Sequence, residues 1–78
     1  MPLQLLEQTA VLTGHISVED AEPLTEWLRQ TEDPAVDLGG CAHVHTAALQ
    51  SLLSARPRIA VMPADDFLLA WVVPLLLS

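Results

Sequence analysis

The chain has 78 residues, of which 51% are hydrophobic and 17% are charged. A chain of this length cannot supply two separate cores, and its apolar content is well above that of disordered sequences, so we expect one domain over residues 1–78. Ten acidic residues and three arginines give a net charge of −7. This charge repels phosphate groups, which disfavours nucleic acid and anionic membrane surfaces as partners.

The cysteine count and the apolar runs predict the cellular compartment of the chain. Cys41 is the one cysteine and cannot form an internal disulfide, and the N-terminus lacks a signal-peptide pattern, so we expect a cytoplasmic location. The longest apolar run, residues 67–77, contains Pro74. It is shorter than the roughly 20 residues that cross a bilayer, so we expect no membrane insertion.

Two short strands and a helix are predicted in the first part of the chain. Residues 4–7 and 10–12 have strand composition, the second ending at Thr13-Gly14, and the two are expected to pair. A helix is predicted over residues 17–31, and Pro23 is expected to make its start irregular or to displace it. Its capping pair and inward face are Ser17, Asp20, Ala21, Leu24, Trp27 and Leu28.

The second part of the chain alternates strands and helices. Residues 35–38 predict a buried, central strand that ends abruptly at Gly39-Gly40, a pair expected to adopt positive φ. A loop over residues 39–45 then leads to a helix capped by Thr46, which carries Leu49, Leu52 and Leu53 inward and ends before Pro57. A strand over residues 58–62 and a third helix from about Phe67, capped by Asp65 or Asp66, complete the pattern.

The resulting order is β-β-α-β-α-β-α. Strands separated by helices are normally parallel, with right-handed connections. The predicted fold class is therefore α/β, with a small mixed sheet of about four strands covered by about three helices.

Residues 36–53 carry a strand with a central Asp37, a loop, and the run His45-Thr46-Ala47-Ala48-Leu49 at the start of a leucine-rich helix. This stretch resembles a STAS domain, the sulphate-transporter and anti-sigma-factor-antagonist family, in which an Asp-Ser-Ser-Gly-Leu-like motif stands at this place. His45, Ala47 and Ala48 replace the Asp, the second Ser and the Gly of that motif. The resemblance extends over about residues 9–73, and the chain stops after the third helix, where many family members continue.

The resemblance implies a non-catalytic domain that docks onto a kinase-like anti-sigma factor, a transporter or a complex subunit through the start of this helix. In several members the Ser at the place of Thr46 is phosphorylated. The alternative is a constitutive accessory subunit of a transport or chemosensory complex that is not phosphorylated. The residues expected to contact a protein partner are Gly40, Cys41, His43, His45, Thr46 and Gln50.

Thr46 has two interpretations. As an N-cap, its hydroxyl accepts a backbone N–H bond and stabilises the helix by about 1 kcal/mol. As a phosphoacceptor, it would add a charge of about −1.5 to −2 to an acidic protein and repel a docked partner.

Metal binding and catalysis are predicted to be absent. Cys41, His43 and His45 alternate, so an extended backbone would present them to one side, but a closed zinc site needs a fourth ligand, and His15 is distant in sequence. The serines lack a nucleophile-elbow context. A chain this short hardly encloses the roughly 300–1,000 Å³ of a small-molecule site, so we predict no enzyme and no cofactor.

The third predicted helix is hydrophobic on all sides, which a surface helix should not be. Because so short a chain cannot surround it, we expect Phe67 and Trp71 to contribute to self-association, as in a homodimer.

Overall fold

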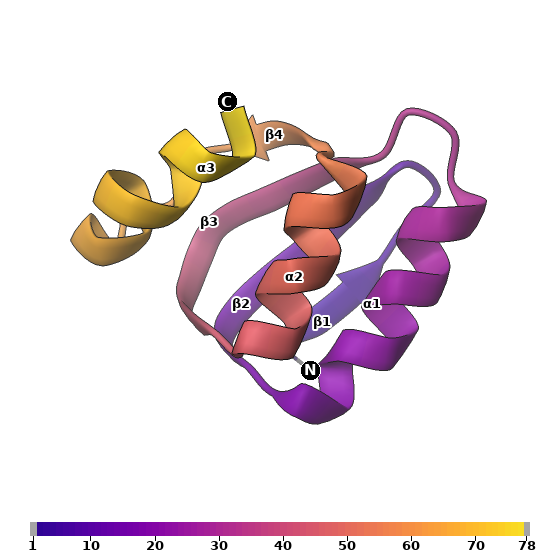
Figure 1. Ribbon diagram of the computed structural model, residues 1–78, viewed down its shortest axis with the longest axis horizontal. Coiled ribbons are helices and arrows are strands. Elements are labelled where there is room, and N and C mark those ends of the chain that lie inside the picture. The colour runs from indigo at the N-terminus through magenta and orange to yellow at the C-terminus, as the bar shows by residue number, and fades with distance from the viewer. Residues whose placement is uncertain (1, 78) are drawn as a thin grey trace.

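The four strands pair side by side in chain order, β1-β2-β3-β4, to form one mixed sheet, shown in the computed structural model of Figure 1. Residues 2–77 are described. β1 and β2 are antiparallel, whereas β2, β3 and β4 are parallel. The predicted fold class and order of elements are confirmed. The elements are β1 (Leu3–Leu5), β2 (Thr9–Ile16), α1 (Val18–Gln30), β3 (Ala35–Val44), α2 (Thr46–Ala55), β4 (Arg58–Val61), the π-helical turn η1 (Leu68–Val72) and α3 (Val73–Leu77).

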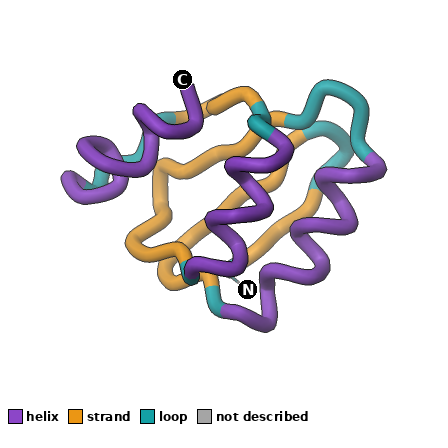
Figure 2. Tube along the Cα trace, viewed as in Figure 1, coloured by secondary structure: helices purple, strands orange, loops and turns teal. Residues whose placement is uncertain are grey.

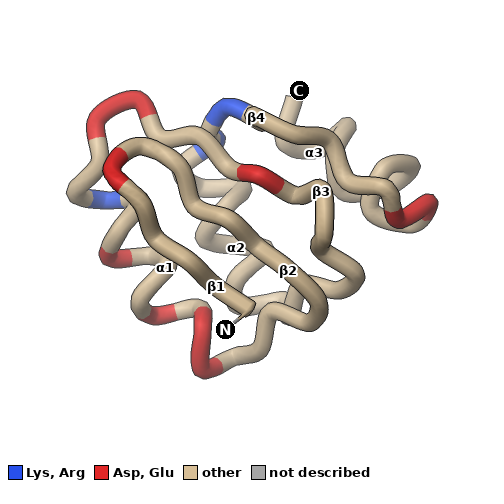
Figure 3. The backbone as a smooth tube through the Cα atoms, turned by 180° about the vertical axis from the view of Figure 1, so that it is seen from behind, with Lys and Arg blue, Asp and Glu red and all other residues tan. Residues whose placement is uncertain are grey.

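The helices cover one face of the sheet. Figure 2 shows the helices in front of the strands, and Figure 3, seen from behind, shows the strands in front. One hydrophobic core fills the space between the two layers, and every strand except β4 and every helical element contributes buried side chains to it. The buried members are Leu3, Ala10, Leu12, Ile16, Ala21, Leu24, Leu28, Val36, Leu38, Cys41, Ala48, Leu52, Leu68, Val72 and Leu76.

β2 is longer than predicted, because Gly14 does not end it. Gly14 has a φ of 62° and lies where the pairing with β3 shifts register, so the strand passes through an irregularity and continues to Ile16. Glycine populates this left-handed region without steric cost. The extension matters because it carries His15 to the far end of the sheet.

α1 begins at Val18, and the capping box predicted for its start is present. The Asp20 carboxylate accepts hydrogen bonds from the Ser17 backbone N–H at 2.8 Å and from the Ser17 hydroxyl at 3.0 Å. These bonds fix the first turn ahead of Pro23, which lies exposed inside the helix. The expectation that Pro23 displaces the start is therefore wrong. The Trp27 indole donates to the Leu6 carbonyl at 2.9 Å and ties α1 to the β1–β2 connection.

β3 differs most from the prediction. The strand does not end at Gly39-Gly40 but continues to Val44, and neither glycine has a positive φ. The glycines are needed for close approach instead: a Cβ on Gly39 would lie 3.0 Å from Val61 Cγ1, and one on Gly40 would lie 3.2 Å from Thr13 Cγ2. The predicted loop over residues 39–45 is thus the second half of a strand.

The C-terminal helical segment (residues 66–77) starts as predicted, with the Asp65 carboxylate accepting from the Leu68 N–H at 3.0 Å. Leu68, Val72, Val73 and Leu76 are buried, whereas Phe67 and Trp71 are 65% and 67% exposed. The expected exposed apolar surface of this helix is therefore present. None of the helices formed by residues 2–77 has the length and apolar character needed to cross a bilayer.

A substitution at Leu52 can test whether α2 packs into the core, because the Leu52 side chain is fully buried. Leu52→Ala should lower the free energy of unfolding by about 2–5 kcal/mol through lost contacts and a residual cavity. Leu6→Ala removes the same atoms from a side chain that is 48% exposed and should cost less than about 1 kcal/mol. Urea denaturation measures both, and equal losses would contradict this packing.

Candidate functional site

All three histidines of the chain gather at one end of the sheet. His15 near the end of β2 pairs in register with His43 of β3, and their ring centroids lie 5.7 Å apart with the planes tilted by 46°. His45 follows directly after β3. All three side chains are exposed. The carboxyl ends of two central parallel strands thus present one close pair of imidazoles, followed in sequence by His45.

Sequence reasoning connected His43 with His45 but left His15 apart. The parallel pairing of β2 and β3, the strands on either side of α1, brings the three histidines to one end of the sheet, because it places Ile16 beside Val44. Two parallel strands joined by one helix place their carboxyl ends at the same edge of the sheet. Placing His15 beside His43 requires that β2 extends past Gly14. The predicted strand ended at Gly14, which left His15 outside the sheet.

α2 starts at Thr46, but its N-cap is His45 rather than Thr46. The His45 Nδ1 accepts the Ala47 N–H at 3.0 Å, and the His45 N–H donates to the Ile16 carbonyl at 2.8 Å. Because that second bond still belongs to the pairing with β2, the strand and the helix meet at His45. The prediction of Thr46 as the cap is wrong by one residue; Thr46 is the first helical residue and is exposed.

Cys41 does not belong to the exposed surface. Its side chain lies in the core, and its Sγ is 3.8 Å from the His43 carbonyl oxygen. Burial raises the pKa of the Cys41 thiol above its ordinary value and outweighs a backbone hydrogen bond with His43, which lowers it; the nearby charge of Asp65 also raises it. The neutral thiol behaves here as a small apolar side chain.

The expected alignment of Cys41, His43 and His45 on one side is not formed. β3 carries an extra residue relative to β2 at Ala42, which breaks the alternation between Cys41 and His43. Within residues 2–77, no three His, Cys, Asp or Glu side chains are grouped so that they could hold a metal ion.

The two remaining residues predicted to bind a partner are exposed, on different elements. Gly40 lies in β3 opposite Thr13, and Gln50 lies on α2. No charged residue occurs in residues 38–55, although the chain carries a net charge of −7. The acidic first turn of α1, with Glu19 and Asp20, follows directly after the end of β2 and borders this uncharged stretch.

A groove of about 540 Å³ runs between α1 and α2. It is larger than we expected of so short a chain, because it opens along the surface between two helices instead of being enclosed. Its lining residues are Thr25, Leu28, Arg29, Pro34, Ala47, Gln50, Ser51, Ser54 and Ala55.

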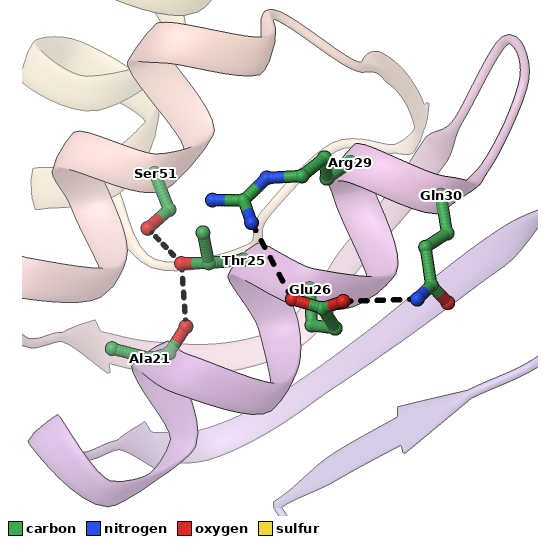
Figure 4. Close-up of polar contacts among 6 residues, drawn as sticks. All are labelled: Ala21, Thr25, Glu26, Arg29, Gln30 and Ser51. Atoms are coloured by element: carbon green, nitrogen blue, oxygen red, sulfur yellow. Dashed lines mark hydrogen bonds and ion pairs between the residues drawn. The ribbon is translucent and has the colours of Figure 1, made fainter.

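The hydroxyl groups in this groove bond to each other and to the helices. Thr25 Oγ1 donates to the Ala21 carbonyl at 2.7 Å and is hydrogen-bonded to the Ser51 hydroxyl, as Figure 4 shows. At the rim, Arg29 forms an ion pair with Glu26. The Thr25 and Ser51 hydroxyls therefore connect the two helices, and they do not converge on a point where a substrate could react.

Comparisons with protein-family models, curated proteins and solved structures found no match.

The identity of the cap is testable by substitution. His45→Ala should lower the free energy of unfolding by about 0.5–2 kcal/mol because the Ala47 N–H loses its acceptor, and His45→Asn should recover most of that loss. Thr46→Ala should change stability by less than about 0.5 kcal/mol, since this exposed side chain is not the cap. Chemical denaturation measures all three variants, and a larger loss from Thr46→Ala than from His45→Ala would contradict the assignment.

Because the pKa of buried Cys41 is raised, we expect the free energy of unfolding to depend on pH in the alkaline range. The chain has no Lys and no Tyr, so Cys41 is its one side chain with an ordinary pKa between about 8 and 10. Because the folded-state pKa is raised, the unfolded chain loses the thiol proton first. The contribution of Cys41 to stability should be constant below the ordinary pKa of a thiol and should fall as the pH rises above it.

Urea denaturation between pH 7 and pH 10 measures this effect. Cys41→Ala is the control: it should be less stable than the wild type at pH 7, but without the alkaline decline that the thiol causes. Equal declines in both proteins would contradict the buried, neutral thiol.

Proposed function

We propose that this domain is a non-enzymatic regulatory or adaptor module that docks onto a protein partner through its histidine surface. This name denotes the exposed residues at the carboxyl ends of β2 and β3 and along the start of α2. They are His15, Gly40, His43, His45, Thr46 and Gln50. The observation that carries the proposal is the placement of all three exposed histidines at the carboxyl ends of β2 and β3, with the ring centroids of His15 and His43 lying 5.7 Å apart.

The electrostatics of the histidine surface support a protein partner. Residues 38–55 contain no Asp, Glu, Lys or Arg, so a partner docking against this stretch does not have to desolvate a carboxylate, ammonium or guanidinium group there. Imidazole, hydroxyl and amide groups offer both hydrogen-bond donors and acceptors. A nucleic acid would bring phosphates toward a protein with a net charge of −7, which disfavours it.

The histidine surface is also preorganised. His43 lies within β3, His45 is held by one hydrogen bond to Ile16 and another from Ala47, and Thr46 lies in the first turn of α2. Binding to a surface on regular elements requires little ordering of the backbone, which lowers the entropic cost of association.

The order of elements supports a role of the STAS kind. The strand before the motif, the helix after it and a four-stranded mixed sheet are what the resemblance implies. His45 stands at the place of the family's Asp and serves as the N-cap. On this basis the partner is an anti-sigma or kinase-like protein, or a subunit of a larger complex, and the cytoplasm is the compartment in which we expect to find it.

Site-specific photocrosslinking in cells that express the chain natively tests the proposal. Benzoylphenylalanine placed at Gln50 should crosslink to one protein, and the same group at Gln8 should not. Gln8 is the matched control because it is an exposed glutamine at the opposite end of β2. His15→Ala combined with His43→Ala should reduce the Gln50 crosslink several-fold. No crosslink from Gln50, or equal crosslinks from both positions, would contradict the proposal.

A switch at Thr46 is tested separately. Thr46→Glu places a negative charge at the start of α2 and should reduce the crosslink from Gln50 by about tenfold if phosphate at this position repels the partner. Thr46→Gln is the matched control of equal size without charge and should retain the crosslink. Equal yields would exclude the switch and favour the constitutive adaptor.

A further inference from the structure

The C-terminal helical segment is shaped by a proline. Pro74 has no N–H, and its ring would clash with the carbonyl four residues earlier in a regular α-helix. The turn before it is π-helical: the Val73 N–H donates to the Leu68 carbonyl, five residues back. A widened turn of this kind relieves the clash and lets both Val72 and Val73 enter the core.

The π turn also aligns the exposed side chains. It lengthens the helical repeat beyond 3.6 residues, so that side chains four residues apart return to the same side of the segment. Phe67, Trp71 and Leu75 are spaced in this way, and all three are at least half exposed. We call these three residues the apolar stripe.

The apolar stripe is large for a chain of this size. The exposed area of its three side chains is on the order of 350–400 Å². A standard interface buries about 800 Å² per partner, so these three side chains supply a little under half of one. Isolated solvent-exposed leucines need no explanation, but a stripe with both a Phe and a Trp does.

From this stripe we infer that a second copy of the same chain covers it, in an antiparallel, two-fold arrangement centred on Trp71. The stripe has Trp71 in the middle and one large apolar side chain four residues away on each side. A two-fold axis at Trp71 therefore sets the tryptophans against each other, and Phe67 of each copy against Leu75 of the other. Such self-complementarity is what a symmetric dimer interface requires.

The charges at the two ends of the segment favour the same arrangement. Exposed Asp66 lies at the amino end. Arg56 lies at the carboxyl end, where its Nη1 donates to the Leu75 carbonyl at 3.5 Å. In an antiparallel pair, Asp66 of each copy comes close to Arg56 of the other, whereas a parallel pair would bring like charges together. The helix dipoles also oppose one another only in the antiparallel pair.

The apolar stripe shares no residue with the histidine surface. Its residues follow β4, whereas the histidines lie at the ends of β2 and β3. A dimer would therefore carry two copies of the histidine surface. A partner with two binding sites would bind the dimer more tightly than a monomer, because the second contact forms at a high effective concentration once the first has formed.

Sedimentation velocity of the full chain between about 1 and 100 μM tests the inference. The wild type should approach twice its 8.5 kDa mass. Trp71→Glu should stay monomeric, because a carboxylate would be buried at the centre of the interface. Val18→Glu is the control, since Val18 is 55% exposed and lies at the start of α1; it should dimerise like the wild type. A wild type that remains monomeric at 100 μM, or a Trp71→Glu protein that dimerises equally well, would overturn the inference.

Charge reversal tests the antiparallel arrangement without touching the apolar stripe. Asp66→Arg should weaken the dimer by about three- to tenfold, the range for an exposed ion pair replaced by repulsion. Adding Arg56→Asp should restore it, because Asp tolerates the left-handed backbone at this position, where φ is 49°. Glu32→Arg makes the same change in net charge at an exposed position elsewhere and should not weaken the dimer. Equal effects of Asp66→Arg and Glu32→Arg, or no recovery in the double variant, would overturn the antiparallel arrangement.

Discussion

The structure depends on the continuity of β3 through Gly39 and Gly40. This ten-residue strand pairs with β2 on one side and β4 on the other, so that every other strand is placed directly or indirectly by it. Val61 packs closely against Gly39, and Thr13 packs closely against Gly40. A Cβ at either glycine would crowd the side chain of a residue on a neighbouring strand. The second half of β3, which carries His43 and leads into α2, follows directly after this closely packed pair of glycines.

The continuity of β3 determines where the histidines of this surface lie. If the chain left the sheet at Gly39, His43 and His45 would lie on a loop, and His15 would have no neighbour. Because β3 continues beside β2, His15 and His43 face each other across the two strands, and His45 ends the strand and caps the helix. The docking surface that we propose thus consists of strand ends and a helix start, which hold their geometry in the absence of a partner. The apolar stripe likewise depends on backbone geometry, since the π turn before Pro74 directs Phe67, Trp71 and Leu75 to one side.

Much of the fold was predictable from local chemistry. The apolar faces of α1 and α2, the Ser17–Asp20 capping box and the Asp65 cap are encoded within one or two turns, and all were identified in the sequence. The glycines were not predictable in this way. Gly14 was expected to end one strand, and Gly39 and Gly40 were expected to end another and to begin a loop with positive φ. At Gly39 and Gly40 the requirement comes from side chains of neighbouring strands, and at Gly14 from a positive φ where the pairing with β3 shifts register, so none of the three can be read from adjacent residues. The proximity of His15 to His43 was missed for the same reason, and the cap at His45 was misassigned to Thr46 because Thr is the commoner capping residue.

The most direct test of this account is amide hydrogen exchange across β3 in the isolated protein. If β3 continues to Val44 as part of the sheet, the amides in residues 40–44 that pair with β2 should be protected, and their protection should be comparable to that of paired amides in residues 35–38. Exchange in residues 40–44 as fast as in residues 62–64, which lie outside the helices and strands, would show that the segment is a loop. That result would contradict both the continuous strand and the preorganised histidine surface.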